Sequence, residues 1–82
     1  MRNKKGAETM AEIKYPNIEA ERVRKGLSQD ELAEKLHCER KSYFNWLTTG
    51  KIPGTILVSL AEMFDCSTDY LLGRTRNPII NQ

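Results

Sequence analysis

The stretch that most constrains the fold is residues 28–46, because it carries the signals of two short helices. Ser28 is followed three residues later by Glu31, which is the spacing of a capping box at a helix N-terminus. Two sets of apolar residues then repeat at the spacing of one helical face: Leu32, Ala33 and Leu36, and later Tyr43, Trp46 and Leu47. The stretch therefore predicts helices at about residues 29–36 and 40–48, joined by a tight turn.

Three further helices are expected around this pair. One begins after Pro16, with Asn17 as its N-cap, and ends at Gly26, because glycine favours the left-handed backbone that closes a helix. The other two span about residues 55–64 and 68–72. The expected apolar anchors of the first helix are Ile18, Val23 and Leu27.

No segment alternates in polarity as a half-buried strand would, so we expect an all-α fold. The 82 residues leave room for one core. We expect a compact five-helix domain at residues 15–73, preceded by a flexible basic tail at 1–14 and followed by a C-terminal tail at 74–82.

Charge is spread unevenly along a chain whose formal net charge is only +2. Residues 37–51 carry +2, whereas residues 53–73 carry −3 and contain no lysine or arginine. A positive turn and helix beside a negative C-terminal region suggest one face that meets a polyanion. An ordinary mixed surface is the alternative.

Two short helices joined by a tight turn form a helix-turn-helix, a motif whose second helix lies in the major groove of DNA. The outward face of residues 40–48 carries the expected base contacts: Arg40, Lys41 and Asn45. Arginine and lysine can donate to guanine O6 and N7, and asparagine suits adenine N6 and N7. The alternative is that all three side chains are only solvated.

A second group is expected to contact the DNA backbone, which positions a protein without reading sequence. Its members are Gln29, Ser42, Thr48, Lys51, Gly54 and Thr55. Phe44 lies at the flank of the second helix, where it would touch either a thymine methyl group or a protein partner.

The inventory of reactive residues predicts no enzyme, no metal site and no cofactor. His37 is the only histidine, and the neighbouring Cys38 lacks the further ligands that zinc requires. No Gly-rich phosphate loop is present. Cys38 and Cys66 are expected to be small buried side chains rather than a disulfide. The longest apolar stretch, residues 56–60, is far too short to span a bilayer, so we expect no membrane contact and a cytoplasmic protein.

Residues 17–73 resemble the lambda-repressor/Cro type of helix-turn-helix domain. The residues that carry the resemblance are Ser28-Gln29, Leu32-Ala33, Leu36, Trp46, Gly50-Lys51, Pro53 and the closing segment CSTDYLLG at 66–73. The resemblance implies a lambda-repressor-like five-helix fold and sequence-specific binding of double-stranded operator DNA. It also implies a homodimer, at least on DNA, and a phage or bacterial regulator that works at the nucleoid.

Three positions depart from the pattern of that family. His37 stands where the family usually has a left-handed glycine, and Glu39 stands where it has a capping serine or threonine. Leu47 replaces an acidic residue that often pairs with an arginine of the first helix, so Arg22 is expected to lack that partner.

Two functions stay open at this stage. The first is a transcriptional regulator, and the second is a protein-interaction module of the same fold, such as an antitoxin or an adaptor of a regulator. The basic outward face of the second helix favours DNA, whereas Phe44, Val58 and Met63 favour a protein partner. A dimer surface is expected in the last helix and tail, with these apolar residues available: Leu71 or Leu72, Ile79 and Ile80.

Overall fold

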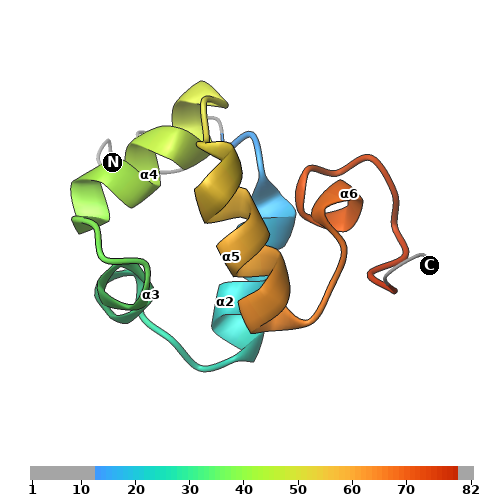
Figure 1. Ribbon diagram of the computed structural model, residues 1–82, viewed down its shortest axis with the longest axis horizontal. Coiled ribbons are helices and arrows are strands. Elements are labelled where there is room, and N and C mark those ends of the chain that lie inside the picture. Colours follow the sequence, from blue (N-terminus) through green and yellow to red (C-terminus); the bar gives the residue numbers. More distant parts are fainter. Residues whose placement is uncertain (1–12, 80–82) are drawn as a thin grey trace, which may run out of the picture.

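The structure is a computed structural model that describes residues 13–79. Five helices follow one another in this part of the chain: α2 (Pro16–Arg24), α3 (Gln29–Lys35), α4 (Arg40–Thr49), α5 (Gly54–Phe64) and α6 (Thr68–Leu71). Figure 1 shows α3 and α4 at one end of the molecule and α6 at the other, with α2 and α5 between them. The predicted all-α, lambda-repressor-like fold is confirmed, and the predicted helix ends lie within about two residues of those observed.

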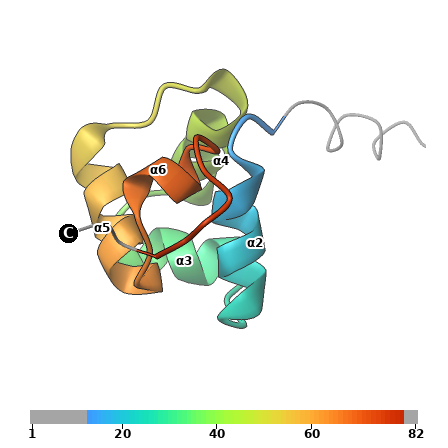
Figure 2. The ribbon, with the colours of Figure 1, turned by 90° about the vertical axis from the view of Figure 1, so that its right-hand side faces the viewer.

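The hydrophobic core draws on every helix. Its largest fully buried side chains are Tyr43, Ile18, Leu32, Leu47, Leu60 and Leu71. Burying a side chain of this size stabilises a fold by roughly 1.5–3 kcal/mol. Because each of the five helices supplies at least one of these side chains, none of them is a peripheral addition. Figure 2, seen from the α6 end, shows α6 in front with α5 and α2 on either side of it.

Local backbone signals begin α3 and end α2 as the sequence predicted. The capping box of α3 is formed, since the Glu31 N–H donates to Ser28 Oγ at 3.0 Å and the Ser28 N–H donates to Glu31 Oε1 at 2.7 Å. Gly26 has a positive φ of 74° after α2. The Leu27 N–H reaches back to the Arg22 carbonyl at 3.1 Å, which is the pattern of a Schellman closure.

The turn between α3 and α4 passes through a left-handed residue. His37 has φ 60°, so the expectation drawn from the family pattern is confirmed, although histidine replaces glycine there. The Cys38 N–H donates to the Ala33 carbonyl at 3.0 Å and closes the end of α3. Ala33 itself is 2% exposed beneath this turn.

Three predictions about individual residues are wrong. Asn17 does not cap α2, because Pro16 is already the first helical residue, and its Nδ2 instead donates to the Tyr70 carbonyl at 2.7 Å. Val23 is 63% exposed and anchors nothing, because α2 turns Ile18 and Glu21 inward. Leu71 is fully buried in the core and cannot belong to a dimer surface.

Segments next to the predicted domain bounds also contact the helices. The Lys14 N–H donates to the Leu47 carbonyl at 2.7 Å, and the Tyr15 hydroxyl donates to the Gly50 carbonyl at 2.8 Å. Beyond α6, the Ser67 N–H donates to the Pro78 carbonyl at 3.0 Å. The bounds 15–73 stay a prediction, and residues 1–12 and 80–82, including Ile80, lie outside the described part. None of the helices α2 to α6 is long and apolar enough to cross a membrane.

Candidate nucleic-acid interface

Helix α4 separates its side chains into a buried and an exposed set. Tyr43 and Leu47 are fully buried, and Trp46 packs against the core while remaining partly exposed. The three residues predicted to contact bases, Arg40, Lys41 and Asn45, are all exposed on the same helix. The amphipathic pattern of residues 40–48 therefore describes α4 correctly, and the contact of these three side chains with DNA stays a prediction.

Arg40, the first residue of α4, is not free in the protein alone. Its Nε lies 3.3 Å from Asp30 Oδ1 on α3, so an ion pair joins the two helices of the motif. Both side chains are largely exposed, at 58% for Arg40 and 82% for Asp30. Sequence reasoning missed Asp30, because its partner lies ten positions away, across the turn.

The residues predicted to contact the DNA backbone surround α4. Lys51 is exposed in the loop between α4 and α5, Gly54 and Thr55 are exposed at the start of α5, and Ser42 on α4 is partly exposed. The Thr48 hydroxyl is engaged within the helix, where it donates to the carbonyls of Phe44 and Asn45, each at 3.2 Å. The structure thus places these residues on α4, in the loop that follows it and at the start of α5, while Gln29 is the first residue of α3.

The starts of α4 and α5 lack side-chain caps. Glu39 occupies the N-cap of α4 and accepts no capping hydrogen bond, as expected for a poor N-cap residue. Pro53 occupies the N-cap of α5 and cannot supply a capping side-chain oxygen. The first backbone N–H groups of both helices therefore have no partner among residues 13–79, which leaves them available to an anion.

A carboxylate on α2 connects the helices of the motif. Glu19 Oε1 accepts from Gln29 Nε2 at 3.1 Å and from Arg22 at 3.0 Å. Glu19 Oε2 accepts from the Tyr43 hydroxyl at 2.6 Å and from Arg22 Nε at 3.0 Å. Glu19 therefore holds the start of α3 and the middle of α4 to the same side of α2.

These bonds perturb the ionisation of the groups that make them. Burial alone would raise the pKa of Glu19, but hydrogen bonds from Arg22, Tyr43 and Gln29 outweigh it and the pKa is lowered. Burial, together with the bond to Glu19, raises the pKa of Tyr43 well above that of a free tyrosine. The carboxylate is thus ionised and the phenol neutral at physiological pH.

Arg22 has a partner after all. Leu47, which stands where the family often has an acidic residue, is fully buried in the core. Glu19 takes over that role through a bidentate pair, and Arg22 also donates to the Leu27 carbonyl. The spacing of Glu19 and Arg22 on one helix is visible in the sequence, but the approach of Tyr43 and Gln29 is not.

The histidine, cysteine and acidic side chains that the structure describes are spread apart. Within residues 13–79 no three histidine, cysteine, aspartate or glutamate side chains converge to hold a metal ion. Cys38 and Cys66 are both free thiols, the first partly and the second fully buried. Burial raises the pKa of the Cys66 thiol, which makes it less reactive.

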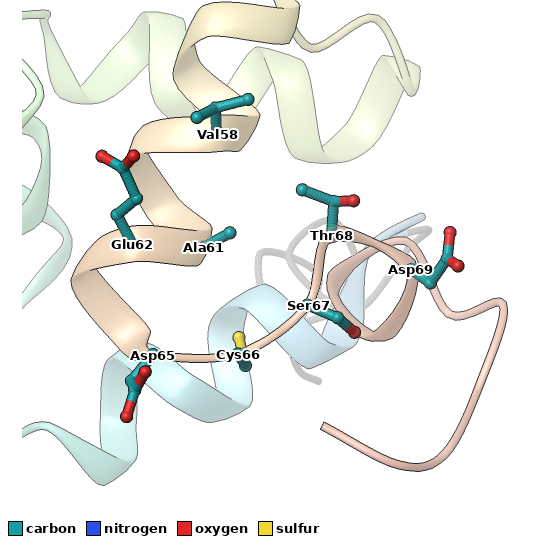
Figure 3. A pocket seen from close by; sticks show the side chains of 8 residues that line it. All are labelled: Val58, Ala61, Glu62, Asp65, Cys66, Ser67, Thr68 and Asp69. Atoms are coloured by element: carbon teal, nitrogen blue, oxygen red, sulfur yellow. The ribbon is translucent and has the colours of Figure 1, made fainter. Parts of the chain in front are cut away.

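An open groove of about 550 Å³ lies between α5 and α6. Figure 3 shows its side chains, with Val58 and Ala61 on α5 and the carboxylates of Glu62, Asp65 and Asp69 around them. The other lining residues are Cys66, Ser67 and Thr68. The groove belongs to the negative part of the chain, and none of its residues is among the predicted DNA contacts.

Comparisons with known proteins agree with this geometry. A family model described as helix-turn-helix matches residues 18–71. The chain is 40% identical over 53 residues to the uncharacterized HTH-type transcriptional regulator YobD of Bacillus subtilis (strain 168), a match that covers 63% of this chain and 47% of that relative. The chain thus spans about half the length of the curated relative it matches, and no solved structure matches significantly. The predicted family is confirmed: the chain belongs to the lambda-repressor/Cro-type helix-turn-helix family of DNA-binding domains.

Proposed function

We propose that this protein is a sequence-specific transcriptional regulator that reads operator DNA with α4 in the major groove. The observation that carries the proposal is the division of α4, which buries Tyr43 and Leu47 and leaves Arg40, Lys41 and Asn45 exposed. The curated relative is named a transcriptional regulator, and we extend that role to this chain. A regulator of the repressor type acts without catalysis or a cofactor, in the cytoplasm at the nucleoid.

Each exposed side chain has a base that suits it. Arg40 can donate twice to guanine O6 and N7, Lys41 can donate to the same acceptors, and Asn45 can pair with adenine N6 and N7. Lys41 and Asn45 lie four positions apart and therefore on one face of the helix. Such a face would read a few adjacent base pairs.

Backbone contacts would fix α4 in the groove. Lys51 and the free N–H groups at the start of α5, at Gly54 and Thr55, suit one phosphate strand. Gln29 has one amide N–H engaged by Glu19 and a second that could donate to a phosphate. Thr48 would have to release a helix carbonyl to donate to DNA, so its contribution is the smallest of the set. Ser42 completes the set with its hydroxyl.

We infer that binding requires two copies. One short helix reads too few bases for tight specific binding, whereas two copies on a two-fold axis would read half-sites about one helical turn apart. With Leu71 in the core, Leu72 and the 70% exposed Ile79 are the described apolar residues left for a dimer surface near the C-terminus. Ile79→Ser tests this surface by sedimentation and by operator affinity, and unchanged values in both would exclude Ile79.

The test of the whole proposal is selection of bound sites from a random pool of duplex DNA. Arg40→Ala should weaken binding to the selected site by roughly 1–3 kcal/mol and relax the choice of one base pair. Lys51→Ala should weaken all sequences about equally and flatten the dependence of affinity on salt. An unchanged preferred site with unchanged affinity in Arg40→Ala would mean that α4 does not read DNA in this way.

A protein-interaction module of the same fold is the second candidate. Val58 is 50% exposed beside the groove between α5 and α6, which supports a protein partner at that end. Phe44 on α4 and Met63 on α5 are also partly exposed and would offer further apolar contacts to a partner. Absence of any salt-dependent shift with random duplex DNA would favour this candidate over the first.

A further inference from the structure

Asp30 meets Arg40 at one edge of the guanidinium group. The closest approach is 3.3 Å, between Arg40 Nε and Asp30 Oδ1. Among the residues that the structure describes, no hydrogen bond engages the two terminal nitrogens of Arg40, whose side chain is 58% exposed. An ion pair with both side chains this exposed contributes little to the stability of the fold.

The free end of the guanidinium is the part that matters for base reading. A planar guanidinium offers donors in a rigid fork, and a pair of its N–H groups matches the O6 and N7 acceptors of a guanine. A flexible arginine must lose its freedom of rotation to make both bonds, and a carboxylate held against Nε removes part of that freedom in advance.

We propose that Asp30 is a specificity-determining residue that holds Arg40 by its Nε edge so that its terminal amino groups face a guanine. This inference rests on the proposed function, in which Arg40 reads a base. Asp30 also follows Gln29, a proposed phosphate contact, so its charge lies close to the DNA backbone. At a base other than guanine, the held arginine cannot make its two base bonds, and nothing then offsets the repulsion between Asp30 and the phosphates.

Two simpler roles for Asp30 predict different results. A carboxylate in the first turn of α3 favours the helix dipole, and loss of that effect would change stability alone. A negative charge near DNA weakens binding to every sequence alike, and loss of that effect would change affinity alone. Neither role would alter which base is preferred.

Glu34 provides a matched control. It lies one turn further along α3, is exposed, and forms no ion pair with any residue from 13 to 79. Glu34→Ala therefore removes one negative charge from the same helix without touching Arg40. Asp30→Asn keeps the shape of the side chain and removes its charge, which guards against any folding defect specific to alanine at that position.

The experiment measures base choice in five proteins: the wild type, Asp30→Ala, Asp30→Asn, Glu34→Ala and Arg40→Ala. Each is used to select sites from one random duplex pool, and its affinity is then measured for the wild-type site and for versions with each guanine replaced. Melting temperatures recorded on the same samples establish that all five are folded.

We expect both Asp30 variants to lose about fivefold in discrimination at the guanine that Arg40→Ala identifies, which corresponds to about 1 kcal/mol. Their affinity for unselected DNA should be equal to that of the wild type or tighter. Glu34→Ala should tighten all duplexes alike and keep the base preference. Unchanged discrimination in the Asp30 variants, with a clear loss in Arg40→Ala, would overturn the role of Asp30 alone. If Arg40→Ala also changes no base, both the role of Asp30 and the reading of DNA by Arg40 are wrong.

Discussion

Two turns of this chain are built alike and lead into different helices. Residues 32–38 read LAEKLHC and residues 60–66 read LAEMFDC. Each helix ends in a left-handed residue that is not glycine, His37 at φ 60° and Asp65 at φ 55°. In each turn the following cysteine N–H donates to the alanine carbonyl five positions before it, at 3.0 Å in both cases. One turn leads into α4 at the candidate interface, and the other leads into α6 at the opposite end (Figure 1).

The likeness extends to the way in which both helices are tied to α2. The Tyr43 hydroxyl of α4 donates to Glu19 at 2.6 Å, and the Tyr70 hydroxyl of α6 donates to Glu21 at 3.1 Å. Helix α2 therefore holds one helix at each end through a carboxylate and a tyrosine. The bonds differ in number, since Glu19 also accepts from Arg22 and Gln29.

The contrast lies in the starts of the two helices. Ser67 caps α6, because its Oγ accepts from the Tyr70 N–H at 3.0 Å, whereas Glu39 gives α4 no such bond. The same turn therefore leads into a closed helix start in one place and an open one in the other. An open start has backbone N–H groups free for an anion, which agrees with a role for α4, and not α6, in contacting DNA.

The largest effect on stability should come from the carboxylates of α2, Glu19 and Glu21, which make different numbers of hydrogen bonds. Glu19→Gln should lower the free energy of unfolding by about 2–3 kcal/mol, because it breaks charge-assisted bonds and leaves Arg22, 16% exposed, without a counter-ion. Glu21→Gln should lose about 1 kcal/mol or less, since the amide oxygen can still accept from Tyr70 and Arg24 lies 3.6 Å away with 67% exposure. Urea unfolding at neutral pH measures both. Equal losses would show that the two ties are equivalent and that the extra bonds of Glu19 contribute nothing.

The same carboxylate gives the fold a sensitivity to acid. The pKa of Glu19 is lowered in the folded protein. Its contribution to folding stability is therefore complete above the unfolded pKa of about 4.3 and is lost as the pH falls through the folded pKa. The difference in stability between the wild type and Glu19→Gln should therefore shrink below about pH 4.3. Urea midpoints of both proteins across this range test the sign, and a gap that stays constant or widens with acid would contradict it.

The two alanines of the paired turns should respond differently to a larger side chain. Ala33 is 2% exposed between α3 and α4, so Ala33→Leu should cost about 1–3 kcal/mol through overpacking. Ala61 is 9% exposed and lines the groove beside α6, as Figure 3 shows, so leucine there has open space on one side. Ala61→Leu should cost less than about 1 kcal/mol. Melting temperatures compare the pair, and a wild-type value for Ala33→Leu would mean that α3 and α4 can separate at this point.

The sequence predicted those features of the fold that are set by residues close together in the chain. The capping box at Ser28 and the inward face of Tyr43 and Leu47 both follow from spacing within one or two turns. Family pattern added the expectation at His37, which residue type alone would not give.

Tertiary contact between residues far apart in the chain explains why Asn17 and Glu19 were misjudged. Asn17 was expected to serve its own helix, but it bonds to Tyr70, 53 positions away. Glu19 was not singled out, because two of its four bonds, those from Gln29 and Tyr43, depend on how α3 and α4 pack against α2. Asp65 has the same left-handed backbone as His37 and was overlooked for want of a family pattern at that turn.

The difference in capping predicts effects of opposite sign. Ser67→Ala should cost about 1 kcal/mol, because the Tyr70 N–H loses its acceptor in a partly buried site. Glu39→Ser should stabilise the fold by about 0.5–1 kcal/mol, since serine can cap α4, while the loss of an acidic group near the helix start offsets part of the gain. Denaturant midpoints test both variants. A lower midpoint for Glu39→Ser would mean that Glu39 makes a contact within the protein that stabilises the fold more than a serine cap does.

The smallest effects should come from the two left-handed residues themselves. A residue with a Cβ carries strain in this backbone, and glycine relieves it, but glycine also increases the freedom of the unfolded chain. His37→Gly and Asp65→Gly should therefore both be near neutral or stabilising by less than about 1 kcal/mol. Asp65→Gly should gain more, by a few tenths of a kcal/mol, because the aspartate places a negative charge at the negative C-terminal end of α5. This electrostatic part of the gain comes from a solvent-exposed charge, so high salt should screen it. The stabilities of the two variants should then become equal. Urea midpoints at low and high salt measure the difference in stability between the two variants, with operator affinity recorded for His37→Gly on the same samples. A difference that does not respond to salt would be due to backbone strain. A loss of affinity in His37→Gly with stability intact would place the His37 ring at the DNA.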